Sequence, residues 1–280
     1  MTRRVLAVLT LCLMTAAAYG QRGKAKQPEF DTTAFNARFD IARWMTKYDM
    51  MARNTAEHLL RYAGADVALL GPEWFCFEDS AGIWHAVYGS YLPEQNLYDL
   101  VFHYTVDQVA TMQATDAVVD SAILNPHARA LKTAYRRLGE TTDSLPGKMA
   151  PFIRQNPDRT FSVWILPAFQ NFTAMYGGEY AYVVDESGNH ILRDDSYVSQ
   201  DGFRAVSVEK PVMVWLDYAG ADAPPLGAIF FAWYFRTYFP RVIIDTDRSV
   251  SMLLKTADGW QWANNVKPES PKGGKARGRK

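Results

Sequence analysis

The feature that most constrains the fold is the hydrophobic period of residues 31–64. Apolar side chains recur there every three or four positions, which is the spacing of one helical face. Asp31 offers an N-terminal cap and Gly64 offers a stop, so the pattern predicts one long helix. So regular a stripe could form a dimer seam, but its threonine and its aromatic rings favour packing on a sheet. The stripe consists of Phe35, Phe39, Ala42, Met45, Tyr48, Met51, Thr55, Leu59 and Tyr62.

A period typical of strands replaces the helical one after residue 73. Residues 73–78 and 83–88 are rich in aromatic side chains and flank a short polar turn at 79–82. This arrangement predicts a β-hairpin. Residues 97–104 have the same character and could pair with the hairpin as a third strand.

The following segment regains helical character and then breaks. Residues 107–124 suit a helix, and Asn125 and Pro126 predict the start of a further helix that ends at Gly139. Prolines and glycine within 141–157 make that segment the best candidate for a linker or a boundary between sub-domains.

The second half of the chain is mostly strand. A polar turn at 186–189 predicts a hairpin between two of these strands. Residues 226–239 are ambiguous, because their aromatic side chains favour a strand whereas their length and the flanking prolines favour a helix, which we prefer. The predicted strands cover 160–166, 179–185, 190–193, 203–208, 212–218, 241–246, 250–256 and 260–264.

These elements predict an α+β protein. Strands joined by short turns indicate mainly antiparallel sheet, on which the long N-terminal helix and further helices pack, and the C-terminal half is β-rich. The β-rich portion either continues the preceding domain or forms its own. The expected order is a signal peptide (1–20), a disordered lead (21–30), a helix-rich α+β portion (31–145), a β-rich portion (146–266) and a disordered basic tail (267–280).

The N-terminus has the three parts of a secretory signal. Arg3 and Arg4 precede an apolar run at 5–18, and small residues precede a cleavage point before Gln21. The run is shorter than the roughly twenty residues that a membrane anchor needs. We therefore expect a soluble protein that is exported to the periplasm or the extracellular space.

The formal net charge of zero conceals a separation of charges. Residues 28–266 carry 19 Lys and Arg against 29 Asp and Glu, whereas the tail at 267–280 is strongly basic. An acidic body argues against nucleic acid as a partner. The tail could touch an anionic envelope surface or could simply keep the protein soluble.

Familiar catalytic and cofactor motifs are missing from the sequence. It contains no HExxH metal motif, no phosphate-binding loop, no GxGxxG after a strand and no GxSxG nucleophile elbow. We therefore expect no cofactor and no metal, and the sequence favours a non-enzymatic protein.

One group of residues could still support chemistry. Glu78, Asp79, His85 and His103 lie on or near the predicted hairpin and its neighbouring strand. If those strands are adjacent, the carboxylates and imidazoles could bind a ligand or a divalent cation, or serve as acid and base. The alternative is ordinary turn chemistry for the acids and a core position for the histidines.

Other reactive side chains favour structural interpretations. Cys76 lies among aromatic residues and is expected to be a small buried hydrophobe rather than a nucleophile. His58 and His127 are expected on helix surfaces. The acidic pairs at 194–195 and 245–247 suggest calcium ligands, but both suit turns at strand ends.

Aromatic residues make up 14% of the chain, which is its most distinctive composition. The run at 230–235 cannot point every ring inward from one element, so Trp233 is a candidate for a surface that binds protein, peptide or carbohydrate. The sequence thus favours a non-enzymatic exported binding protein. The alternatives are an envelope-associated structural or assembly factor and a hydrolase of unfamiliar type near His85. The oligomeric state stays open.

Overall fold

The computed structural model describes residues 29–62, 64–107, 111–142, 144–145, 147–210 and 213–268. The predicted signal peptide lies outside the described residues, as do nearly all of the predicted lead and the tail beyond Pro268.

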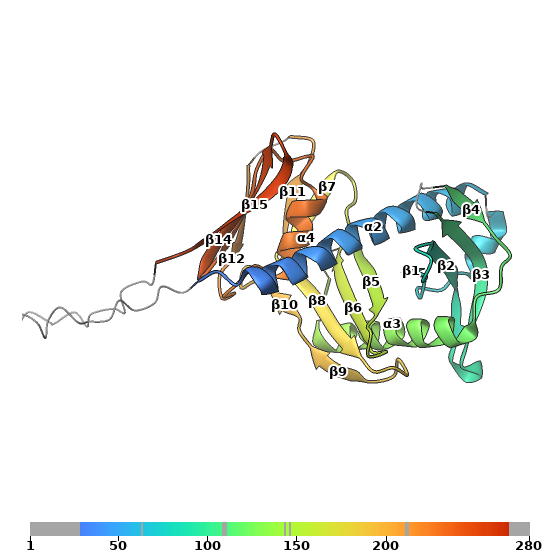
Figure 1. Ribbon diagram of the computed structural model, residues 1–280. Coiled ribbons are helices and arrows are strands. Elements are labelled where there is room, and N and C mark those ends of the chain that lie inside the picture. The colour runs from blue at the N-terminus through green and yellow to red at the C-terminus, as the bar shows by residue number, and fades with distance from the viewer. Residues whose placement is uncertain are drawn as a thin grey trace, which may run out of the picture. The chain divides into compact units, whose positions relative to one another are not determined.

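The protein has the predicted α+β class, with a long N-terminal helix and a β-rich C-terminal half (Figure 1). The α-helices of the described chain are α2 (Thr32–Tyr62), α3 (Ser121–Thr141) and α4 (Leu226–Tyr234). Two short 3-10 helices, η1 (Gly64–Leu69) and η2 (Pro93–Gln95), lie in connections. Within the described part of the chain, none of the helices combines the length and the apolar content that a bilayer-crossing segment needs.

Helix α2 follows the predicted periodicity closely. Asp31 caps it, because its Oδ1 accepts a hydrogen bond of 2.9 Å from the backbone N–H of Ala34. Most of the predicted apolar face packs within the chain, although Tyr62 at its end is exposed. Its buried residues are Phe35, Ala42, Met45, Tyr48, Ala52, Thr55 and Leu59.

The first sheet contains β1 (Phe75–Glu78), β2 (Trp84–Leu92), β3 (Leu97–Val106) and β4 (Met112–Ala114), all antiparallel and in that order. The predicted hairpin and its third strand are confirmed. Asp79 fixes the hairpin turn, because its Oδ1 accepts the N–H groups of Ala81 and Ile83, each at 2.9 Å. The side chain thereby replaces backbone partners in a tight turn.

The helix predicted at 107–124 is wrong. The described residues of this segment hold β4 and chain without regular secondary structure, and α3 begins only at Ser121. Asp120 is the N-cap, since its Oδ1 accepts the N–H of Ala122 at 2.8 Å. The predicted start at Asn125 and Pro126 is therefore late, and Pro126 lies inside the helix. The helix also continues to Thr141, past Gly139.

The middle sheet has the order β10-β8-β6-β5, and β9 pairs with β8 beside β10. Strand β5 falls within 141–157, which therefore is not simply a linker. Pro151 suggested a break, but β5 is an edge strand of this sheet, where proline is tolerated. The strands are β5 (Met149–Gln155), β6 (Phe161–Pro167), β8 (Gly178–Val184), β9 (Ile191–Asp194) and β10 (Tyr197–Val198).

The third sheet has the order β12-β13-β14-β15. Strands β12 and β13 run parallel and are connected through α4, which is the exception to the predicted antiparallel pairing. Helix α4 resolves the ambiguity at 226–239 in favour of a helix, although it ends at Tyr234. The strands are β12 (Val214–Tyr218), β13 (Val242–Thr246), β14 (Ser249–Thr256) and β15 (Gly259–Val266), and a separate pair joins β7 (Thr173–Tyr176) to β11 (Arg204–Ser207).

Helix α2 runs past all three sheets (Figure 1). Near its start, Phe35 meets Trp262 of β15 with ring centroids 5.1 Å apart. In its middle, Tyr48 meets Phe152 of β5 at 5.3 Å. Towards its end, Thr55 hydrogen-bonds to Tyr88 of β2 at 2.7 Å. One helix thus links sheets that are far apart in the sequence.

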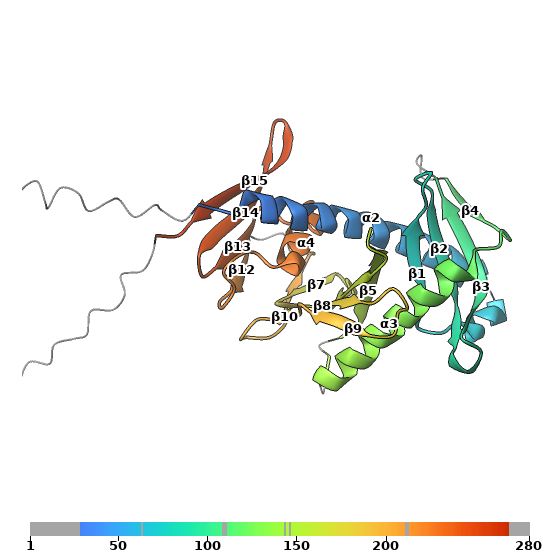
Figure 2. The ribbon, with the colours of Figure 1, turned by 60° about the horizontal axis from the view of Figure 1, so that its bottom comes forward.

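The middle sheet is covered on both faces (Figure 2). Helix α3 packs on one face, where His127 meets Phe161 with ring centroids 4.8 Å apart. Helix α2 covers part of the other face, where Trp44 lies 6.0 Å from Trp164. Aromatic rings thus take part in the packing on both faces of the sheet. Because α2 covers only part of its face, the remaining strand surface can form the floor of a cleft.

Candidate functional site

The structure brings together three of the four residues predicted near the first hairpin. His85 Nε2 lies 3.3 Å from Asp79 Oδ2, and His85 Nδ1 lies 2.9 Å from His103 Nε2. His103 Nδ1 in turn lies 3.0 Å from the carbonyl oxygen of Ala117. We call Asp79, His85 and His103 the histidine chain. Glu78 does not join it, and its side chain is exposed.

The carbonyl of Ala117 fixes the direction of these hydrogen bonds. A carbonyl oxygen only accepts, so His103 donates from Nδ1 and its Nε2 is left as an acceptor. His85 must then donate from Nδ1 to His103. Its Nε2 lies 3.3 Å from Asp79 Oδ2, and this contact is a hydrogen bond only when Nε2 also carries a proton.

The environment supports this assignment. Burial lowers the pKa of His103, and the neighbouring His85 lowers it further, so His103 stays neutral. Partial desolvation raises the pKa of Asp79, but hydrogen bonds from the backbone of Ile83, from His85 and from Ala81 outweigh this and hold the pKa below its usual value. The hydrogen bonds of the histidine chain connect β1, β2 and β3 to the segment after β4.

The histidine chain lacks the features of a catalytic or metal centre. It ends on a backbone carbonyl, where a catalytic triad would present a nucleophile. Among the residues that the structure describes, no cluster of three or more histidine, cysteine or acidic side chains is arranged to hold a metal ion. What the arrangement does is tie strands together through charged hydrogen bonds.

Cys76 has its predicted buried position. Its side chain is 0% exposed, and burial raises the pKa of its thiol. A thiol that is inaccessible and protonated is not a nucleophile. His58 is half-buried and lies beside Tyr104.

The prediction that His127 lies on a helix surface is wrong. Its side chain is only 4% exposed and stacks on Phe75 with ring centroids 5.0 Å apart. Nδ1 donates to the carbonyl oxygen of Ile123 at 2.7 Å. His127 lies four residues before the buried Leu131 and therefore on the apolar face of α3, and burial lowers the pKa of His127 to about 4.

Trp233 is half-buried and packs on neighbouring side chains of the same protein. Its ring meets that of Phe39 at 4.9 Å, and the guanidinium of Arg236 lies 4.0 Å from its centroid. Phe230, Phe231 and Phe235, from the same run, are buried in the core. The acidic pairs are also engaged within the chain, as Asp245 pairs with Lys267 and Asp194 with Arg137.

A large recess lies on the face of the middle sheet that α2 leaves uncovered. It has a volume of about 700 Å³ and lies between α2, the sheet and the segment that leads into α4. We call it the arginine cleft. The residues that define it are Arg38, Arg154, Trp164, Glu179, Arg193 and Tyr197.

The guanidinium of Arg154 is a half-buried cation that lies between two aromatic rings. The guanidinium carbon lies 5.5 Å from the ring centroid of Trp44 and 5.7 Å from that of Trp164. The side chain is half-buried, and within the described residues it forms no ion pair with a carboxylate. Desolvation alone lowers the pKa of Arg154. The aromatic rings stabilise the cation, but they leave its N–H donors free for an acceptor in the cleft.

Glu179 lies at the end of the cleft beside the start of α4. It is 6% exposed, and its carboxylate accepts hydrogen bonds from the backbone N–H groups of Leu226, at 3.2 Å, and of Gly227. A Cβ at position 227 would lie 2.7 Å from Glu179 Oε2, so any other residue there would displace the carboxylate. Burial raises the pKa of Glu179 to about 7, although both N–H groups and Arg38 oppose the shift.

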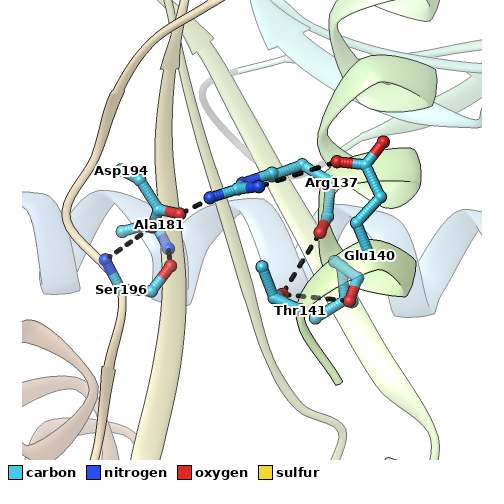
Figure 3. A network of polar contacts seen from close by, with 7 residues as sticks. Arg137, Glu140, Thr141, Ala181, Asp194 and Ser196 are labelled. Atoms are coloured by element: carbon cyan, nitrogen blue, oxygen red, sulfur yellow. Dashed lines mark hydrogen bonds and ion pairs between the residues drawn. The ribbon is translucent and has the colours of Figure 1, made fainter. Parts of the chain in front are cut away.

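The wall opposite α2 is held by α3 through a polar network (Figure 3). Arg137 Nε lies 3.4 Å from Asp194 Oδ2 and Nη1 lies 3.6 Å from Glu140 Oε2. Ser196 accepts the N–H of Ala181 at 3.1 Å. These contacts fix the turn between β9 and β10. They thereby position Arg193 and Tyr197 beside the cleft.

A second cleft of about 570 Å³ lies on the other side of the Trp44 ring. Arg154 lines both clefts, and Glu78, Asp79 and His127 line the second one. Two of the residues predicted from the sequence therefore do border a recess. It has two acidic side chains, as the arginine cleft does, but one arginine where the arginine cleft has three.

Fold and site together define an α+β protein with a charged cleft beside its long helix. No protein-family model, no curated protein and no solved structure gives a significant match to this chain.

Proposed function

We propose that the protein is an exported, non-enzymatic binding protein, and that its ligand enters the arginine cleft with an anionic group. Arg154 is the observation that carries the proposal. A half-buried guanidinium without a carboxylate partner is costly to desolvate, and an incoming anion would recover that cost. Export rests on the signal pattern at residues 1–20 of the sequence.

The shape and lining of the cleft support a small ligand. Its volume falls within the range of about 300–1,000 Å³ that ligand pockets usually have. Apolar side chains of Ile41, Trp164 and Pro224 line it together with the charged groups. Such a mixture suits a molecule with an apolar or flat body and one charged end.

Charge contrast adds to this support. The body of the chain is acidic overall, yet Arg38 and Arg154 meet in one recess and form no ion pair within the described residues. Arg193 is different, because it pairs with Asp195 at 2.6 Å. The first two arginines are therefore available to a ligand.

The hydrolase alternative has weaker support. The histidine chain offers two imidazoles and a carboxylate, but it leads to the carbonyl of Ala117 and His103 is only 5% exposed. A hydrolytic site needs a nucleophile or an activated water within reach of the base. The contacts of His103 leave no position for either.

Nuclear magnetic resonance can test whether the cleft is the binding site. Phenylacetate, a flat monocarboxylate, would be titrated into protein labelled at the indole N–H groups. We expect the signal of Trp164, which lines the arginine cleft and not the second cleft, to move in the wild type and in Arg43→Met, whose arginine is exposed and paired with Asp40. It should stay fixed in Arg154→Met. Equal shifts in both variants would contradict the proposal.

A further inference from the structure

The charges of the arginine cleft nearly balance. Because Asp195 neutralises Arg193, the net charge of the cleft is set by Arg38, Arg154 and Glu179. One positive charge is in excess when Glu179 is ionised, and two are in excess when it is protonated. A ligand with a single negative charge reduces this excess in either state, and its charge beside Glu179 favours the protonated form of that carboxyl.

Glu179 is enclosed by groups from every element around it. Arg38 of α2 faces it, and α4 contributes only the N–H groups of Leu226 and Gly227, because no residue from Leu226 to Tyr234 is charged. Tyr197 of β10 and Tyr218 of β12 lie near enough to interact with its charge. Within the cleft, the remaining charged groups are Arg154 of β5 and the paired Arg193 and Asp195 beside β9.

We infer that the arginine cleft binds a monocarboxylic acid with an apolar or aromatic body, and that Glu179 takes up a proton when the ligand's carboxylate enters. This inference rests on the proposed function. A carboxylate is the anion of choice because its two oxygens match the planar N–H edge of a guanidinium. Two carboxylates in one buried recess repel each other, and protonation of the protein's own carboxyl removes that repulsion.

The sign of the pH dependence follows from this coupling. Below the pKa of Glu179 the proton is already present, so binding is strongest between that pH and about pH 5, where the ligand's own carboxyl is still ionised. Above neutrality the carboxylate must be protonated as the ligand binds, so the affinity falls as the pH rises. A single linked proton limits the fall to about tenfold for each pH unit.

The burial of Glu179 supports this assignment. The pKa of Glu179, raised to about 7 by burial, allows its charge to change in the neutral range. The two backbone donors of α4 fix the position of the carboxylate, and at least one of its oxygens remains an acceptor after protonation. Ligand and proton therefore meet at a fixed position beside Arg38.

Isothermal titration calorimetry of phenylacetate near neutral pH, in two buffers with different ionisation enthalpies, measures the protons taken up. We expect the wild type to take up a fraction of a proton between zero and one, and its affinity to fall about tenfold or less for each pH unit above neutrality. Glu179→Gln should take up no proton and bind equally well at pH 7 and pH 8. Glu57→Gln, which changes an exposed glutamate on α2, should behave as the wild type.

The outcomes separate this inference from the proposed function. Binding that depends on Arg154 but shows no proton uptake and no pH dependence overturns the inference alone. Absence of phenylacetate binding, or binding that survives Arg154→Met, overturns both. If Glu179→Gln does not fold, the wild-type proton count still decides the question.

Discussion

The guanidinium carbon of Arg154 lies 5.5 Å from the ring centroid of Trp44, and this contact joins the edge strand of the middle sheet to the long helix. Trp164 completes the arrangement, with its centroid 6.0 Å from that of Trp44. The rings hold the cation at the point where two clefts meet. The contact therefore both stabilises the fold and presents a charge to a ligand.

Replacing Arg154 with methionine should separate these two roles. Methionine keeps an unbranched apolar stem between the rings, and it removes the cost of burying an unpaired cation. Since a cation–π contact contributes about 0.5–2 kcal/mol, we expect the free energy of unfolding to change by about 1 kcal/mol or less. Urea denaturation at neutral pH measures this change. A loss of more than about 3 kcal/mol would show instead that Arg154 is mainly structural.

His127 should make the protein less stable in acid. The unfolded chain binds a proton at His127 near pH 6.5, whereas the buried residue has a pKa of about 4. The unfolded state therefore binds more protons between these values, and stability falls as the pH falls from 6.5 to 4. The total loss is on the order of 3 kcal/mol, at about 1.4 kcal/mol for each pKa unit.

Unfolding experiments on His127→Phe test this assignment. The variant keeps a flat ring against Phe75, so its stability should change less with pH between 6.5 and 4 than that of the wild type. His190→Ala, at an exposed position, serves as the control and should keep the wild-type slope. An unaltered slope in His127→Phe would locate the acid sensitivity elsewhere.

The histidine chain predicts one tautomer for each ring. His103 should carry its proton on Nδ1, because that atom donates to the carbonyl of Ala117, and His85 should be protonated on Nδ1 towards His103. Long-range ¹H–¹⁵N spectra of histidine-labelled protein distinguish the tautomers at neutral pH. Finding the proton of His103 on Nε2 would reverse the hydrogen bonds and refute the assignment.

Cys76 should be unreactive until the protein opens. Its thiol is fully buried, and its backbone N–H donates to the hydroxyl of Tyr48 at 3.1 Å. In protein lacking residues 1–20, we expect thiol labelling by a disulfide reagent to be at least about a thousandfold slower than for a free thiol, because the sheet and α2 must separate first. Labelling in urea should then follow unfolding. Rapid labelling of the folded protein would disagree with the position of Cys76.

Local patterns made part of this fold predictable. Helix α2 and the hairpin of β1 and β2 follow from hydrophobic period and turn residues, which depend on neighbours in sequence. The late start predicted for α3 came from treating Pro126 as a cap, when Asp120 had already begun the helix. Strand β5 was missed because Pro151 signals a break unless the strand is known to lie at an edge.

The histidine chain and the arginine cleft also differ in how far the sequence predicts them. The histidine chain was predictable because the hairpin register places Asp79 and His85 near each other, and β3 pairs directly with β2. The arginine cleft was not, because Arg38, Arg154 and Glu179 come from α2, β5 and β8. Only the packing of α2 on the middle sheet brings these three side chains to one recess.

The most direct test of the account compares phenylacetate with its neutral isostere phenylacetamide by isothermal titration calorimetry. We predict that the wild type and Arg43→Met bind the acid at least about tenfold more tightly than the amide, which corresponds to about 1.4 kcal/mol for the charged contact. Arg154→Met should lose this preference while it remains folded. If Arg154→Met still prefers the acid by the same factor, the arginine cleft is not the binding site.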